Sequence, residues 1–114
     1  MLERQIEEYI KRKFDGQKIW YIKFNSASMR GFPDRIVFAP EGKVYFAELK
    51  APNKHPNKLQ EMIHKSLYEN FGHKVWVIDN LRKADEFVNE VLSAQLPKKS
   101  NRKNNKHTEM RNVP

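Results

Sequence analysis

The sequence contains no cysteine, which excludes disulfide bonds and zinc sites built from thiolate ligands. It also lacks any apolar run near the ~20 residues that a membrane-spanning helix needs. The opening segment mixes Glu, Arg and Lys with isolated apolar side chains, which is not the pattern of a secretory signal peptide. We therefore expect a soluble chain that works in the cytoplasm and has no membrane partner.

Length and charge indicate one small domain with an anionic partner. The 114 residues suffice for a single modest hydrophobic core. The net charge of +8 favours binding to nucleic acid. Much of this charge lies in residues 97–114, which carry six basic residues against one acidic residue. We predict a folded domain over residues 1–96 and a basic, disordered tail over residues 97–114.

Apolar spacing and turn residues divide the domain into seven expected elements. Apolar residues recur at helical spacing in three segments, and β-branched and aromatic residues gather in four others. Glycines, prolines and asparagines lie between these segments and mark turns or helix ends. The expected helices cover residues 2–14, 59–71 and 81–92, and the expected strands cover residues 19–24, 34–39, 44–50 and 75–78.

The order of these elements, α-β-β-β-α-β-α, indicates a fold class. The turn at residues 40–43 predicts a hairpin between the second and third strands. The last strand follows a helix that itself follows a strand, which suggests a parallel crossover beside that hairpin. We therefore predict an α/β fold with a mixed β-sheet flanked by helices. Trp20 and Trp76 lie in apolar runs, and we expect both side chains in the core.

An acidic residue and a lysine end the third expected strand. Side chains on a strand alternate between its faces, so Glu48 and Lys50 share one side with Val44 and Phe46. A carboxylate and an ammonium at the end of an apolar row are costly to desolvate without partners. A solvated strand end with a weak ion pair is one explanation. A catalytic site is the other.

Asp34 opens the neighbouring strand, directly after Pro33. A hairpin would bring Asp34 close to Glu48, and two close carboxylates repel unless a proton or a cation lies between them. Mg²⁺ prefers oxygen ligands and often takes only one or two protein carboxylates. We therefore expect Asp34, Glu48 and the backbone carbonyl of Leu49 to hold a metal ion, with Lys50 beside the attacking water. The alternative for Asp34 is an ordinary turn aspartate.

These residues resemble a known signature. A proline-aspartate pair followed by acid-any-lysine is similar to the motif of the PD-(D/E)XK nuclease superfamily. The order of elements also resembles the restriction-endonuclease-like core of that superfamily. A closer resemblance is to its VRR-NUC branch, in the stand-alone form found in phages and bacteria. It rests on Gly31-Phe32-Pro33-Asp34-Arg35, Glu48-Leu49-Lys50-Ala51-Pro52 and Gln60.

The resemblance implies a role for each matching residue. Asp34 and Glu48 would be metal ligands for Mg²⁺ or Mn²⁺, Lys50 the catalytic lysine, and Gln60 a residue at the edge of the site. The family also expects a glutamate on the first helix, where Glu3, Glu7 and Glu8 compete, and Glu8 faces away from the apolar stripe. Glu3 lies nearer the centre of the apolar stripe of that helix, so we choose it, as a catalytic residue and a further metal ligand.

The resemblance further implies a metal-dependent endonuclease that hydrolyses phosphodiesters in branched DNA, with Holliday-junction resolution as the expected activity. Symmetric cutting of a four-way junction needs two active sites, which implies a homodimer. The implied setting is the cytoplasm of a bacterial cell or a phage-infected host, with no small-molecule cofactor. A non-catalytic nucleic-acid-binding module, a less structure-selective DNA nuclease and an RNA-cleaving enzyme remain as alternatives.

Basic residues near the expected site are candidates for DNA contacts. Lys23 lies on the first expected strand, beside a polar loop that ends near Arg30, and Arg35 follows Asp34. We predict that these three side chains contact the nucleic acid. The four histidines show no spacing typical of metal ligands, so we assign none of them to the site: His55, His64, His73 and His107.

Overall fold

The computed structural model of the protein describes residues 1–94, and the predicted basic tail over residues 97–114 lies outside the described residues. The helices and strands follow the predicted order. They are α1 (Glu3–Phe14), β1 (Trp20–Lys23), β2 (Arg35–Ala39), β3 (Lys43–Leu49), α2 (Lys58–Phe71), β4 (Val75–Ile78) and α3 (Leu81–Ser93).

The four strands form one mixed sheet in the order β1-β2-β3-β4. β1 pairs antiparallel with β2, and β2 with β3, whereas β4 pairs parallel with β3. This confirms both the predicted hairpin and the predicted parallel crossover. The hairpin turn places Glu41 and Gly42 at positive φ angles, 66° and 74°. A glycine adopts this left-handed region without the steric cost that a side chain would impose.

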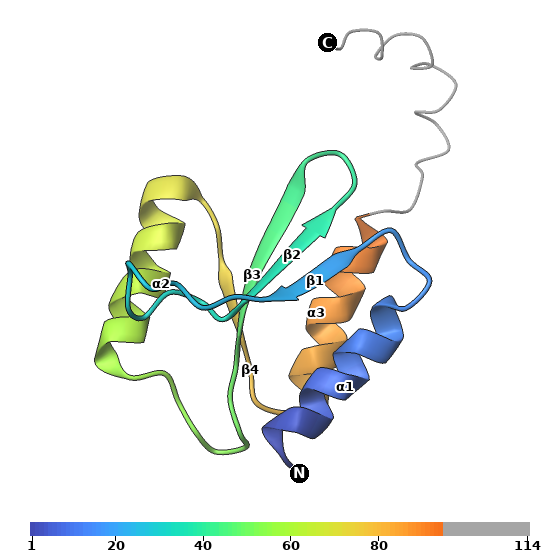
Figure 1. The fold of residues 1–114 in the computed structure, drawn as a ribbon, viewed down its shortest axis with the longest axis horizontal. Coiled ribbons are helices and arrows are strands. Elements are labelled where there is room, and N and C mark those ends of the chain that lie inside the picture. The colour runs from blue at the N-terminus through green and yellow to red at the C-terminus, as the bar shows by residue number, and fades with distance from the viewer. Residues whose placement is uncertain (95–114) are drawn as a thin grey trace, which may run out of the picture.

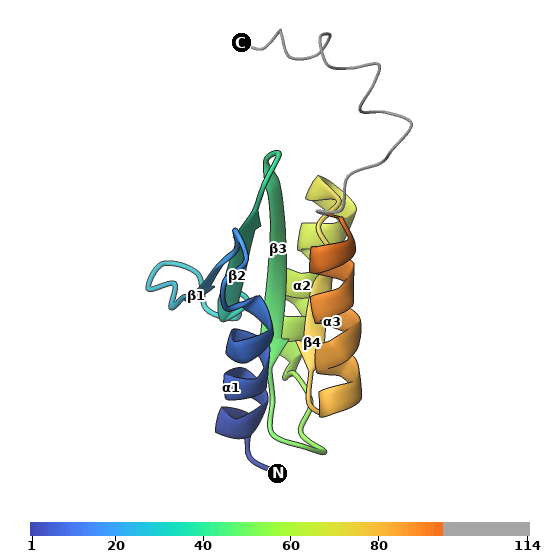
Figure 2. The ribbon, with the colours of Figure 1, turned by 90° about the vertical axis from the view of Figure 1, so that its right-hand side faces the viewer.

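The helices divide between the two faces of the sheet (Figure 1). α1 and α3 contact each other and cover one face, while α2 lies on the opposite side. Figure 2 shows α1 and α3 alongside the strands from the perpendicular direction. Each long helix after the hairpin begins with an asparagine cap, because the side chains of Asn57 and Asn80 accept backbone N–H groups from Gln60 and Lys83.

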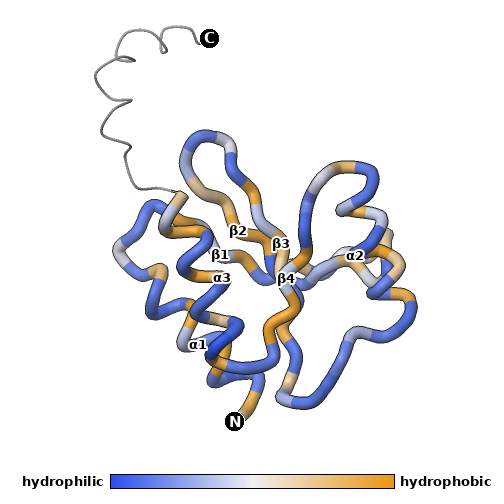
Figure 3. Tube along the Cα trace, turned by 180° about the vertical axis from the view of Figure 1, so that it is seen from behind, coloured by the Kyte–Doolittle hydropathy of each residue, from blue (hydrophilic) through white to orange (hydrophobic). Residues whose placement is uncertain are grey.

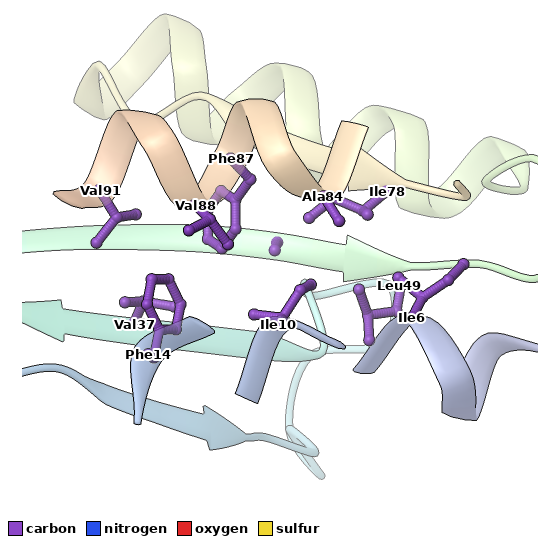
Figure 4. Packing of buried hydrophobic residues seen from close by; sticks show 11 residues of the cluster. Ile6, Ile10, Phe14, Val37, Leu49, Ile78, Ala84, Phe87, Val88 and Val91 are labelled. Atoms are coloured by element: carbon purple, nitrogen blue, oxygen red, sulfur yellow. The ribbon is translucent and has the colours of Figure 1, made fainter. Parts of the chain in front are cut away.

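The core fills the space between the sheet and the α1–α3 pair. Ile6, Ile10 and Phe14 recur along α1 and point toward the strands (Figure 4), which is why this helix has one apolar side. Phe87 of α3 is fully buried and packs edge-on or tilted against three rings. Those rings belong to Phe14, Tyr45 and Trp76.

The α2 side of the sheet is only partly covered. Apolar segments follow the strands, and hydrophilic ones predominate in the loops (Figure 3). Trp20 of β1 is 70% exposed, so the prediction that it lies in the core is wrong. β1 is an edge strand, and α2 lies over the other end of the sheet, so this ring packs edge-to-face on Phe38 but stays largely exposed. Trp76 packs against the core as predicted.

Within residues 1–94, no helix combines the length and the apolar character needed to cross a membrane.

Replacing Phe87 by alanine should destabilise the fold more than any surface change. The ring is fully buried, and loss of a core phenylalanine typically costs about 3–5 kcal/mol through lost transfer energy and a residual cavity. Chemical denaturation measures this difference. Phe71→Ala is the matched control, because Phe71 is 70% exposed at the end of α2 and should change stability by less than about 0.5 kcal/mol. Equal effects would contradict the packing described here.

Candidate active site

The register of the β2–β3 hairpin places the two acidic residues opposite each other. The pairing of β2 with β3 runs from Ala39↔Lys43 to Arg35↔Ala47. The next residue of each strand beyond that last pair is Asp34 on one side and Glu48 on the other. Two hydrogen bonds fix Asp34 at this point. Its carbonyl accepts the Phe24 N–H at 2.9 Å, and its Oδ1 accepts the Leu49 N–H at 3.2 Å.

Glu48 is buried and faces α2. Alternation along β3 sends Ala47 and Leu49 into the core and Glu48 to the other side of the sheet. Its Oε2 accepts a hydrogen bond of 3.0 Å from Gln60 Nε2 and lies 3.7 Å from Lys50 Nζ. The structure therefore brings Glu48, Lys50 and Gln60 together, as the sequence predicts.

The first turn of α2 orients the Gln60 amide. Asn57 and Gln60 form a capping box, in which each side chain accepts the other residue's backbone N–H at 2.8 and 2.9 Å. Gln60 uses Oε1 for this box and Nε2 for Glu48. The Gln60 side chain thus accepts a backbone N–H at the start of α2 and donates to the Glu48 carboxylate at the same time.

Gly31 sets the distance between the Asp34 loop and α2. Its φ angle is +86°, and a Cβ built there would lie 3.0 Å from Leu59 Cγ and 3.2 Å from Ile63 Cγ1. The loop therefore touches α2 at a position where only a glycine fits. This contact places the loop that carries Asp34 against the helix that carries Gln60.

Burial and a neighbouring charge make Asp34 reluctant to ionise. Desolvation, followed by the charge of Glu48, raises the pKa of Asp34 to about 6 from an ordinary value of 3.8. The Arg35 guanidinium and the Leu49 N–H act in the opposite direction, and Glu3 adds a further small increase. Asp34 and Glu48 therefore repel each other, although Arg35 lies 3.4 Å from Asp34 and Lys50 lies 3.7 Å from Glu48. A bound cation would relieve that repulsion.

The two candidate glutamates of α1 have different environments. Glu7 accepts two hydrogen bonds from Arg35, at 2.9 Å from Nε and 2.6 Å from Nη2. Burial raises the pKa of Glu7, but the hydrogen bonds and charge of Arg35 outweigh it, so the net shift is downward. Glu7 is thus occupied by an ion pair. Glu3 is exposed and close enough to affect Asp34, which leaves it as our candidate.

The burial of Arg35 argues against the DNA contact that we predicted for it. Its side chain is only 2% exposed and is engaged by Glu7, by the Asp34 carbonyl and by Asp34 Oδ1, which lies 3.4 Å from Nη1. It therefore joins α1 to the start of β2 and acts as an internal support of the site. Lys23 and Arg30 are exposed, and both remain candidates for contacts to nucleic acid.

His64 is a neighbour of the site that the sequence analysis missed. Its Nε2 lies 3.7 Å from Glu48 Oε1, and its side chain is 12% exposed. The available signal was its position on α2, because residues four apart on a helix lie on the same face. Because Gln60 faces the site, His64 lies on the same face of α2 and also faces the site.

The residues present fit a divalent cation. Glu48 Oε1 is buried without a hydrogen-bond partner, and the two carboxylates crowd each other. Among residues 1–94, no group of three or more His, Cys, Asp or Glu side chains is arranged as a metal site. An ion bound by Asp34 and Glu48 would therefore need further oxygen ligands from the backbone, water or phosphate, as Mg²⁺ often does. Leu49 remains the predicted backbone ligand.

Comparison with known proteins identifies similar chains. No family model matches the sequence. The chain is 45% identical over 58 residues to "Putative nuclease p44" of Acyrthosiphon pisum secondary endosymbiont phage 1. That match covers 51% of this chain and 61% of the relative, so the chain spans about three fifths of the length of this curated relative. A solved structure described as "VRR_NUC domain" superposes with a TM-score of 0.67 and 25% identity, over 75% of this chain and 92% of the other.

The raised pKa of Asp34 predicts a pH-dependent effect of Asp34→Asn. Ionisation of Asp34 is costlier in the folded than in the unfolded state. The contribution of Asp34 to wild-type stability should therefore fall as pH rises from about 4 to about 6 and stay low above that. The asparagine variant should gain roughly 1–3 kcal/mol over the wild type at pH 8 in a chelator, and almost nothing at pH 4.

Denaturation of both proteins across this pH range measures the difference. Asp79→Asn is the control, because Asp79 lies at the start of α3 and pairs with Lys83 at 3.3 Å. A stability gap between wild type and Asp34→Asn that is the same at pH 4 and pH 8 would refute the assigned electrostatics.

Proposed function

We propose that this chain is a metal-dependent endodeoxyribonuclease of the VRR-NUC type. The superposition on a solved VRR_NUC domain and the similarity to a phage protein named as a putative nuclease support this proposal. The proposed substrate is branched DNA, and the proposed reaction is phosphodiester hydrolysis at a Holliday junction. One observation carries the proposal. The hairpin register sets Asp34 opposite Glu48, and the Lys50 ammonium lies 3.7 Å from the Glu48 carboxylate.

Each residue has a role in the proposed mechanism. Asp34 and Glu48 would hold the ion, with the Leu49 carbonyl and Glu3 as further proposed ligands. Mg²⁺ or Mn²⁺ bound there would supply an activated water and a polarised phosphate. Lys50 would hold the attacking water and offset the charge that develops on the phosphate. Gln60 keeps Glu48 in one orientation through its 3.0 Å hydrogen bond.

The surface charge supports a nucleic-acid substrate. The described residues carry 16 Lys and Arg against 13 Asp and Glu, a net charge of +3, and the remaining excess lies beyond residue 94. Lys23 and Arg30 are exposed on β1 and on the loop that leads to Gly31. We propose that they contact phosphates on either side of the scissile bond, which would position the strand without reading its sequence.

A homodimer is part of the proposal. Symmetric cutting of a four-way junction requires two sites related by a two-fold axis. The uncovered end of the sheet offers an apolar surface for a second copy. Trp20 and Phe38 are 70% and 44% exposed and pack edge-to-face across the β1–β2 pair, with Ile22 and Phe24 on the same face. Contiguous exposed apolar side chains of this size mark interaction surfaces.

The decisive test is cleavage of labelled DNA with Mg²⁺ or Mn²⁺. Four-way, flap, single-stranded and duplex substrates, with a matched RNA, should show cutting that is strongest at the junction. Lys50→Ala should lower the rate at least about 100-fold while DNA binding in chelator is retained, because the lost group acts on the transition state. Lys54→Ala, a change in the adjacent exposed loop, should leave the rate nearly unchanged.

Binding without cleavage of any substrate would instead indicate a non-catalytic DNA-binding module. Equal rates on every DNA would indicate a nuclease without structural selectivity, and preference for RNA would overturn the substrate assignment.

The dimer is tested by the molar mass in solution. Wild-type protein at micromolar concentration should have twice the mass of the chain by light scattering, and Trp20→Ser with Phe38→Ser should shift it toward the monomer. Met62→Ser is the control, because Met62 is 66% exposed on α2, away from this surface. A wild-type monomer that still cuts both strands of a junction in one encounter would contradict the dimer.

A further inference from the structure

Two buried polar atoms face each other next to the proposed catalytic residues. Glu48 Oε1 and His64 Nε2 lie 3.7 Å apart, and neither has a hydrogen-bond partner. Their side chains are 4% and 12% exposed. Among residues 1–94, only one other buried side-chain polar atom, the Tyr21 hydroxyl, shares this condition. Buried polar atoms without partners are rare in folded proteins, and such a pair requires an explanation.

The local structure holds both atoms in place. Gln60 binds Glu48 Oε2, which leaves Oε1 as the free oxygen of the carboxylate. His64 lies one turn after Gln60 on α2, and the Asn57 cap fixes the start of that helix. The contact between Gly31 and α2 fixes the helix against the Asp34 loop. The gap between Oε1 and Nε2 is therefore a consequence of how α2 is anchored.

The length of the gap discriminates between its possible contents. A direct hydrogen bond would need about 2.7–3.2 Å between these atoms, so 3.7 Å is too long. A water that bonded to both at ordinary distances and a tetrahedral angle would hold them about 4.5 Å apart, so 3.7 Å is too short. A transition-metal ion lies about 2.0–2.2 Å from imidazole nitrogen and carboxylate oxygen, which permits separations up to about 4.2 Å. The gap is also short enough for an ion pair when His64 is protonated, and a metal ion in it would take the place of that proton.

We propose that Glu48 Oε1 and His64 Nε2 form a binding site for a divalent transition-metal ion, with Mn²⁺ or Zn²⁺ as the occupant. The site rests on the proposed function in that Glu48 is also assigned there as a metal ligand. Imidazole is a good ligand for transition metals, whereas Mg²⁺ is bound chiefly by oxygen. His64 would therefore give this chain a preference for Mn²⁺ and Zn²⁺ over Mg²⁺ that the two carboxylates alone would not provide.

Metal binding by the full chain, without DNA, tests the site. Calorimetric titration with MnCl₂, ZnCl₂ and MgCl₂ should show that His64→Ala weakens Mn²⁺ and Zn²⁺ binding at least about tenfold. Mg²⁺ binding should change less than about twofold. His55→Ala is the matched control, because His55 is an exposed histidine in the loop before α2 and reports adventitious binding. Thermal denaturation in chelator verifies that both variants fold.

A spectroscopic measurement on the wild type adds direct proof. Electron spin echo modulation of bound Mn²⁺ should show coupling to an imidazole nitrogen that persists in His55→Ala and disappears in His64→Ala. Equal weakening of all three metals in His64→Ala, with no nitrogen coupling in the wild type, would overturn the proposal and assign His64 to positioning of Glu48. Unchanged affinities would also overturn it. Because no DNA is present, a chain that binds Mn²⁺ through His64 but cuts nothing would refute only the proposed nuclease activity.

Discussion

The pairing register of β2 with β3 is the constraint on which the whole site depends. Arg35 opposite Ala47 makes Asp34 and Glu48 neighbours, and a slip of one residue would turn every β3 side chain to the other face of the sheet. Two features prevent that slip. Ala47 and Leu49 are buried in the core, and Arg35 is held by Glu7 of α1. The register that forms the site is thus fixed by contacts on the opposite face of the sheet.

The same arrangement of strands and helices causes the repulsion between the two carboxylates of the site. Strand alternation puts apolar residues toward α1 and α3 and a carboxylate toward α2, where little solvent reaches it. Gln60, Lys50 and the Leu49 N–H supply some compensation, yet Asp34 keeps a pKa raised to about 6. Placing a buried carboxylate next to a second, partly buried one costs stability. The cation that we propose for this site would relieve the repulsion between the two carboxylates.

Much of the fold and part of the site were predictable from the sequence, for physical reasons. Periodicity, turn residues and caps are local signals, so all seven elements and the hairpin were found. Asp34, Glu48, Lys50 and Gln60 converge because that hairpin and the α2 cap are themselves local. The errors concern partners distant in sequence. Arg35 is buried by Glu7 of α1, His64 approaches Glu48 only once α2 has docked, and Trp20 is exposed because β1 lies at the sheet edge.

The tight contact at Gly31 has a consequence for how such a protein could be altered. The exposed loop over residues 25–30 directly precedes Gly31, where the backbone lies close against Leu59 and Ile63 of α2. Loops on the surface accept insertions far more readily than packed segments do. New recognition segments could therefore be grafted before Gly31 without moving Asp34, whereas any bulk added at Gly31 itself would act as a wedge between the loop and α2.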